Sequence, residues 1–345
     1  MATIDMHFNE SENYWYYIPE FSYRIIADGR LQDAINLATD SFFPIPVRME
    51  SGQSPLVRKS KEWDSKNMLS KYKTNRQIGV QDIMMIFSGI VVNRSWLAFL
   101  SDQIVHIGET APYTHTHDTS ETMGINNPPK TFALLNVKLN PKTANIKILL
   151  YTGCYVKSYS ETGSVNQFVT GTWEVHASNE VTGAALNTYP TLSTSQYFSF
   201  GEGFTYTFVK GETPYTGVIK SYTFKYDTDK RLNKGMTSLL GLSVLPSNET
   251  DVSLLIQIAP YDYTIIDELE TDPLTASAKV FTMKIARNSV SDYFQIVFTK
   301  AFEKFIGLSY LEGVMVLDFE IMMNTDESGH KLVITEVNAD GSTRY

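Results

Sequence analysis

Four stretches between residues 146 and 227 are rich in aromatic and β-branched residues: IKILLYTGCYVKSYS (146–160), QFVTGTWEVHA (167–177), FSFGEGFTYTFVKGE (198–212) and GVIKSYTFKYD (217–227). Turn residues separate them, and several stretches alternate apolar with polar residues, as half-buried β-strands do. On a strand, one face of the last stretch would carry Val218, Lys220, Tyr222, Phe224 and Tyr226. This part of the chain therefore predicts a β scaffold.

The composition predicts a mainly β globular protein with more than one core. The chain has 345 residues, of which 43% are hydrophobic and 19% charged, and its 20 Tyr and 19 Phe favour sheets and interfaces. Domains typically contain roughly 100–200 residues. We therefore expect two lobes, an N-terminal lobe at 1–145 and a β-rich lobe at 146–345.

The charge and the cysteine content narrow the class of protein. A net charge of −9 argues against a surface that binds nucleic-acid phosphates tightly. It is compatible with a channel wall along which DNA slides without being bound. The single Cys154 cannot form an intramolecular disulfide and fits a buried, inert thiol. The opening MATIDMHFNESE is acidic, so we expect no signal peptide and folding in a reducing cytoplasm.

Several elements outside the central stretch can be assigned from their patterns. Residues 83–100 are apolar but are interrupted by Asn93 and Arg94, which predicts a buried strand and helix rather than a membrane span. Helical spacing behind Asp28 predicts a short amphipathic helix. Toward the C-terminus we expect strands at 252–259, 279–286, 293–300, 314–323 and 331–337, a helical turn near AFEKFIGL (301–308), and a hairpin at DESGH (326–330).

A Pro-containing basic segment precedes the apolar element. Its basic residues include Arg48, Arg58, Lys59, Lys61, Lys71 and Lys73. Such a run is either a solvated loop or an extension that docks on an acidic neighbour, and both readings stay open because the rest of the chain is acidic.

No recognisable catalytic motif emerges from the sequence. His115 and His117, followed by Asp118, are the one compact set of possible metal ligands, but a catalytic metal site needs a third protein ligand. We therefore expect an exposed loop without metal there. The sequence has no Walker-type loop, nucleophile elbow, HExxH or CxxC motif, so we expect no enzymatic activity and no cofactor.

The order of segments from Pro44 to Met323 resembles the major tail tube proteins of long-tailed phages and related archaeal viruses. The resemblance rests on PIPVRMESGQSP (44–55), on the apolar element at 83–100, and on the segments TGCYVKSYSETGSVNQFVTGTWEVHASN (152–179) and GVIKSYTFKYDTDKRLNKGM (217–236). The Tyr/Trp-rich N-terminal segment and the length of the basic arm depart from that family.

The resemblance implies a β-sandwich or half-barrel protomer with one or two flanking helices and an extended arm. Such protomers form rings, commonly hexameric, which stack into a tube that conducts genomic DNA without binding it specifically. It further implies a virion protein assembled in the host cytoplasm, with other tail proteins as partners and no membrane. Unpaired sheet edges, a hazard on a monomer, then become assembly surfaces.

The sequence also allows two other classes of protein, a binding module and a metal hydrolase, and it contains acidic residues that could line a channel. In a carbohydrate- or receptor-binding β module, the cluster at Tyr14–Tyr17 around Trp15 would form a stacking platform. A metal hydrolase built on the two clustered histidines is less well supported. If the acidic excess lines a channel, we expect lining residues such as Glu161, Glu174 and Asp227.

Overall fold

The computed structural model describes residues 13–18, 43–49, 55–64, 77–101, 105–107, 110–118, 131–139, 146–182, 199–200, 204–211, 213–214, 217–234, 241–245, 250–261, 279–287, 292–311, 313–323 and 331–338. Within these residues the chain is mainly β, as the sequence predicts, and its one helix is α3 (Leu97–Ser101). The helix predicted after Asp28 lies outside the described residues.

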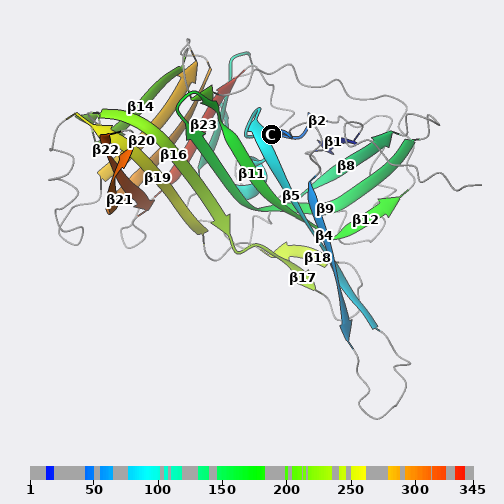
Figure 1. Ribbon diagram of the computed structural model, residues 1–345. Helices are drawn as coiled ribbons and strands as arrows, with labels where there is room; N and C mark the ends of the chain where they lie inside the picture. The colour runs from blue at the N-terminus through cyan, green and yellow to red at the C-terminus, as the bar shows by residue number, and fades with distance from the viewer. Residues whose placement is uncertain are drawn as a thin grey trace, which may run out of the picture.

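A long antiparallel sheet forms the centre of the molecule (Figure 1). Its strands follow one another by direct pairing in the order β4 (Leu56–Asp64), β5 (Gln77–Val91), β11 (Thr170–Ala177), β9 (Ile146–Ser164), β16 (Gly217–Thr228), β19 (Thr250–Pro260), β22 (Val314–Met323) and β21 (Tyr293–Leu311). The short β3 (Val47–Arg48) also pairs with β5.

Two strands change partners along their length and so connect the central sheet to the rest of one 19-stranded network. The first part of β9 pairs with β8 (Phe132–Leu139) and β12 (Asn179–Thr182). The change falls next to Gly153, whose φ of 59° lies in the left-handed region that favours glycine. Beyond β8 follow β1 (Asn13–Ile18) and β2 (Phe43–Pro44).

The first part of β21 pairs with β20 (Lys279–Arg287) on one side and β23 (Leu332–Asn338) on the other. Beyond β20 lie β14 (Phe204–Lys210) and β15 (Thr213–Pro214), and beyond β23 lie β7 (Tyr113–Asp118) and β6 (Val105–Ile107). Two small sheets stand apart, formed by β10 (Gln167–Phe168) with β13 (Ser199–Phe200) and by β17 (Arg231–Lys234) with β18 (Gly241–Leu245).

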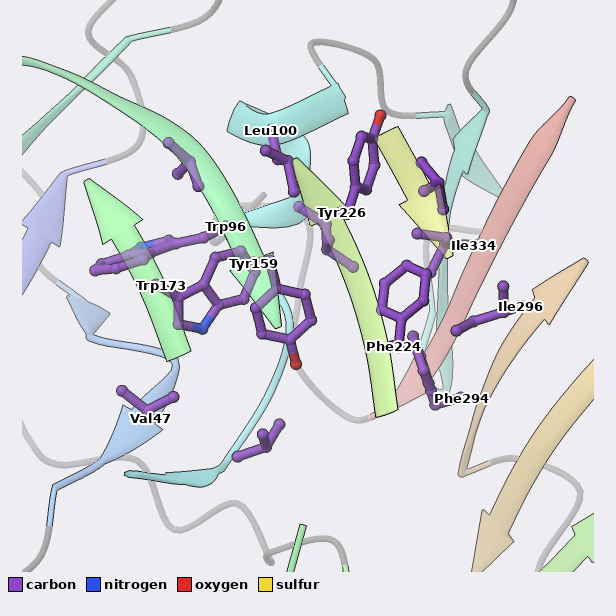
Figure 2. Close-up of a cluster of buried hydrophobic side chains, with 14 of the residues drawn as sticks. Val47, Trp96, Leu100, Tyr159, Trp173, Phe224, Tyr226, Phe294, Ile296 and Ile334 are labelled. Atoms are coloured by element: carbon purple, nitrogen blue, oxygen red, sulfur yellow. The ribbon is translucent and has the colours of Figure 1, made fainter. Parts of the chain in front are cut away.

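One large hydrophobic cluster joins these parts. Side chains of the central strands share it with side chains of β20, β21 and β23, so Phe224 and Phe294 lie in the same buried group (Figure 2). A second cluster, with Tyr16 and Leu135, lies between β1, β8 and β9. Along β16 the burial alternates as its sequence predicts, with Tyr222, Phe224 and Tyr226 buried.

The structure confirms the strand and helix predicted at 83–100, which are β5 and α3. It differs from the sequence interpretation at 301–308, which is part of β21 and not a helical turn, because these residues pair with β22. The last two strands each pair with β21 and, among the described residues, not with one another, so they do not pair as the expected hairpin; DESGH itself lies outside the described residues. The expected lobe boundary lies between β8 and β9, which pair with each other.

Candidate functional site

A fully buried cluster of charges lies where the turn after β5 meets β9 and β23. The Arg94 guanidinium donates to both carboxylate oxygens of Glu161, with Nε at 2.5 Å from Oε2 and Nη2 at 2.7 Å from Oε1. The backbone N–H of Arg94 donates to Glu336 at 3.0 Å, and its Nη1 lies 3.5 Å from the same carboxylate. All three side chains are completely shielded from solvent.

Two tyrosines complete the hydrogen bonding of the Glu161 carboxylate. The hydroxyl of Tyr222 donates to Oε1 at 2.5 Å, and the hydroxyl of Tyr159 donates to Oε2. Burial, followed by the adjacent negative charge of Glu161, raises the pKa of both phenols well above the usual value and keeps them protonated. Burial, the largest single influence, would lower the pKa of Arg94, but the interactions with Glu161, Tyr159 and Glu336 together outweigh it and raise that pKa.

Two glycines in the central sheet make room for these tyrosines. A Cβ on Gly163 would lie 2.3 Å from the Tyr222 ring, and a Cβ on Gly171 would lie 3.2 Å from the Tyr159 ring. Both rings can therefore lie across the neighbouring strand and direct their hydroxyls toward Glu161. On its other side the Arg94 guanidinium sits 3.6 Å above the centre of the Phe294 ring, a cation–π contact.

The chemistry of this cluster is structural. The Glu161 carboxylate accepts four hydrogen bonds and has no exposed surface, so it offers neither a free lone pair nor a path for a substrate. What the cluster does is tie β9 of the central sheet to β23. This corrects the expectation that Glu161 faces a channel. A buried carboxylate must be paired, and the sequence did not indicate its partner.

The short helix α3 is fixed by a buried lysine. Lys230, which follows β16 and is 1% exposed, donates from Nζ to the carbonyl oxygens of Phe99 and Leu100, each at 2.7 Å. The last carbonyls of a helix lack intrahelical partners and carry partial negative charge, so an ammonium group there is favourable. Trp96, just before the helix, packs edge-on against Trp173, with ring centres 5.8 Å apart. Both side chains belong to the buried group drawn in Figure 2.

The candidate metal ligands are not on an exposed loop. His115 and His117 lie on β7, where they face Glu336 and Ile334 of β23 in register, and both are fully buried. The expectation of a solvated loop is therefore corrected: alternate residues of β7 point into the core. In the described part of the chain, no group of three or more His, Cys, Asp or Glu side chains could hold a metal ion.

The face of the central sheet opposite the core is rich in hydroxyl groups. Side-chain hydrogen bonds cross neighbouring strands between Ser88 and Thr172 at 3.0 Å and between Thr162 and Thr223 at 3.3 Å. Further along, Ser221 donates to Gln257 at 3.4 Å, and Gln257 donates to Asp318 at 3.0 Å. A polar surface thus extends from β5 to β22.

Glu174 and Asp227 lie in one row of this polar face, each opposite Ser158 of β9. Glu174 bonds His176 at 2.8 Å and Lys157 at 3.3 Å; burial alone would raise its pKa, but these partners lower it overall. The pKa of Asp227 is raised, first by partial burial and then by repulsion from Asp251, its cross-strand neighbour.

The basic segment is a strand rather than a loop over the part that the structure describes. Arg58, Lys59 and Lys61 lie on β4, which extends with β5 away from the other strands (Figure 1), and Arg48 lies exposed on β3. Lys71 and Lys73 fall outside the described residues. Among the described strands β4 pairs with β5 only, so its other edge is open.

The aromatic cluster near the N-terminus belongs to the core. Trp15, Tyr16 and Tyr17 on β1 are buried, and Tyr17 donates to Ser95 at 2.8 Å. Trp15 packs edge-on against Phe87 of β5, with ring centres 5.1 Å apart. These side chains therefore cannot form the exposed stacking platform that a carbohydrate-binding module requires. Burial also raises the pKa of the Cys154 thiol, in keeping with an inert cysteine.

In the described part of the chain, no helix is long and apolar enough to cross a membrane. Comparison of the sequence with models of known protein families gives no match, and comparison with curated proteins gives none either.

Proposed function

We propose that this chain is a structural virion protein, a tail tube subunit that assembles with copies of itself into stacked rings. The observation that carries the proposal is the central sheet, which has an open edge at each end among the described residues. At one end β4 pairs with β5 only, and at the other residues 302–311 of β21 pair with β22 only. Two different open edges on one protomer suit a head-to-tail contact, which generates a closed ring when the rotation closes.

The arrangement of layers supports the finer fold assignment, a β-sandwich or half-barrel. The buried faces of β16 and β19 share one core with β20, β21 and β23, as the two layers of a sandwich do. The buried bridge from Arg94 to Glu161 and Glu336 joins the same two groups of strands.

The polar face of the central sheet suits a channel wall for DNA. Its hydroxyls can form transient hydrogen bonds with phosphates, while carboxylates such as Glu174 and Asp227 discourage tight binding of a polyanion. We assign this face to the lumen of the proposed tube. In a structure of the assembled tube, an inner surface that is predominantly positive would contradict this assignment.

The test of the proposal is the assembly state of the purified full chain. We expect hexameric rings or hollow tubes by electron microscopy and sedimentation, because the open edges at β4 and at the end of β21 remain to be covered. In the tail the assembled tube would contact other tail proteins at its ends. Monomers that stay monodisperse at high concentration and physiological salt would contradict it.

The basic residues of β4 give a sharper prediction. Reversing Arg58, Lys59 and Lys61 to Glu should weaken assembly, because the rest of the chain is acidic and supplies a complementary surface on a neighbour. The loss should be largest at low salt and fade as ionic strength screens the contact. The control is Lys225→Glu, a single reversal at an exposed position in the middle of the sheet. Assembly by the triple variant equal to that of the wild type would refute this role for the arm.

A further inference from the structure

The hairpin formed by the end of β21 and the start of β22 exposes an unusual concentration of large apolar side chains. These are Phe305, Ile306, Leu308, Tyr310, Leu311 and Val314. Six exposed large hydrophobic residues within ten positions are a dense local concentration of apolar surface, and concentrated exposed apolar surface marks interaction sites more often than scattered single residues do. By contrast, the earlier part of β21 alternates regularly between buried and half-buried residues.

The main chain of the same hairpin is also incomplete in its hydrogen bonding. After Ala301, the side of β21 that faces β20 has no partner strand among the described residues, and β22 pairs with β19 only from Leu317 onward. Apolar side chains therefore coincide with open backbone edges. Hydrocarbon cannot satisfy exposed N–H and C=O groups, whereas a strand added to the edge satisfies them one by one. The occupant that fits is another β-strand, not a lipid bilayer.

We propose that the hairpin at 302–316, the end of β21 with the start of β22, is a docking element that adds to a sheet of a second copy of this chain. A second copy offers such a strand, because nearly every described element is a strand and β4 provides another open edge. This inference rests on the proposed self-assembly and names the part of the protomer that carries it. The apolar side chains would supply the affinity, and the backbone edge would fix the register.

The test is Tyr310→Lys, made in the full chain and matched with Tyr261→Lys. Tyr310 is 72% exposed and Tyr261 is 75% exposed, so both variants change the same residue type at nearly equal exposure, and only the first lies on the hairpin. We expect Tyr310→Lys to raise the concentration needed for assembly at least tenfold, while Tyr261→Lys assembles like the wild type. Both should keep the thermal stability of the monomer, because neither side chain belongs to the core.

The outcomes separate this inference from the proposed function. If the wild type assembles and Tyr310→Lys assembles equally well, the hairpin is not the docking element although self-assembly stands. A wild type that never assembles contradicts both. As a second readout, the thiol of a Ser309→Cys variant should be protected from a maleimide reagent in the assembled protein, whereas that of a Thr170→Cys variant should react; both positions are exposed in the protomer. If the monomer binds phosphatidylcholine vesicles and Tyr310→Lys abolishes that binding, the inference is wrong and the hairpin contacts a membrane instead of a second copy.

Discussion

Replacing Arg94 with Met tests whether the buried charge cluster holds the layers of the fold together. The change keeps an unbranched side chain of similar length but removes the hydrogen bonds at 2.5 and 2.7 Å to Glu161 and the contact over Phe294. It leaves the Glu161 carboxylate with two tyrosine hydroxyls as partners and no positive charge beside it. Breaking a buried ion pair from one side costs about 3–5 kcal/mol.

That free energy can be converted into a melting temperature. Unfolding entropy is about 2.1 cal/mol/K per residue near 60 °C, so 345 residues that unfold as one unit give about 0.7 kcal/mol/K. Arg94→Met should therefore lower Tm by about 4–7 °C in calorimetry. The matched control is Lys157→Met, which removes the cation of the partly exposed Lys157–Glu174 pair, whose effect should be about 1 kcal/mol or less.

A double variant separates charge from packing. Arg94→Met combined with Glu161→Gln removes both members of the bidentate pair, and a well-packed neutral replacement of a buried pair is often close to neutral. We expect the double variant to be more stable than Arg94→Met alone. The reasoning fails if Arg94→Met costs no more than Lys157→Met, or if the double variant loses the sum of both single effects.

Two further predictions concern titration and burial. Asp227→Asn should raise the free energy of unfolding at pH 7, because the pKa of Asp227 is higher in the folded chain than its ordinary value of 3.8 and its ionised form therefore opposes folding. This gain should vanish below about pH 3.8, where the carboxyl group is protonated in both states. Urea unfolding at pH 3 and pH 7 measures the difference, and an equal effect at both pH values would count against the prediction. His117→Ala should destabilise the fold by about 2–5 kcal/mol, because it leaves a cavity in place of a fully buried side chain, whereas Tyr261→Ala on the surface should change little in the same assay.

Much of the β architecture can be predicted from local pattern. In β16 the alternation from Ser221 to Asp227 identifies the buried tyrosines and phenylalanine correctly. The same alternation is wrong at Val218, which is exposed, because a β-bulge between Ile219 and Ser221 shifts the register. A bulge adds one residue without any composition signal, so the period-two pattern does not reveal where it begins.

The candidate site was harder to predict because it depends on contacts distant in sequence. The position of Arg94 within an apolar run argues against a membrane span and is visible in the sequence. Its partner Glu336 is 242 positions away, so no sequence spacing predicts that the two residues meet. The histidines had a usable signal: His115 and His117 alternate with Thr114 and Thr116, which is the period of a strand. Their polarity favoured a loop, and only the pairing of β7 with β23 shows that the imidazoles point inward.

The buried cluster also has a consequence for the proposed assembly. A head-to-tail ring closes only if each protomer sets the same rotation between its two contact edges. In this chain those edges are β4 and the end of β21, at opposite ends of the central sheet, and Glu161 lies on β9 between them. The bridge through Arg94 to Glu336 fixes that middle strand to the second group of strands. Under the proposed function, such a cluster would stabilise the curvature of the sheet, and with it the number of subunits that close a ring.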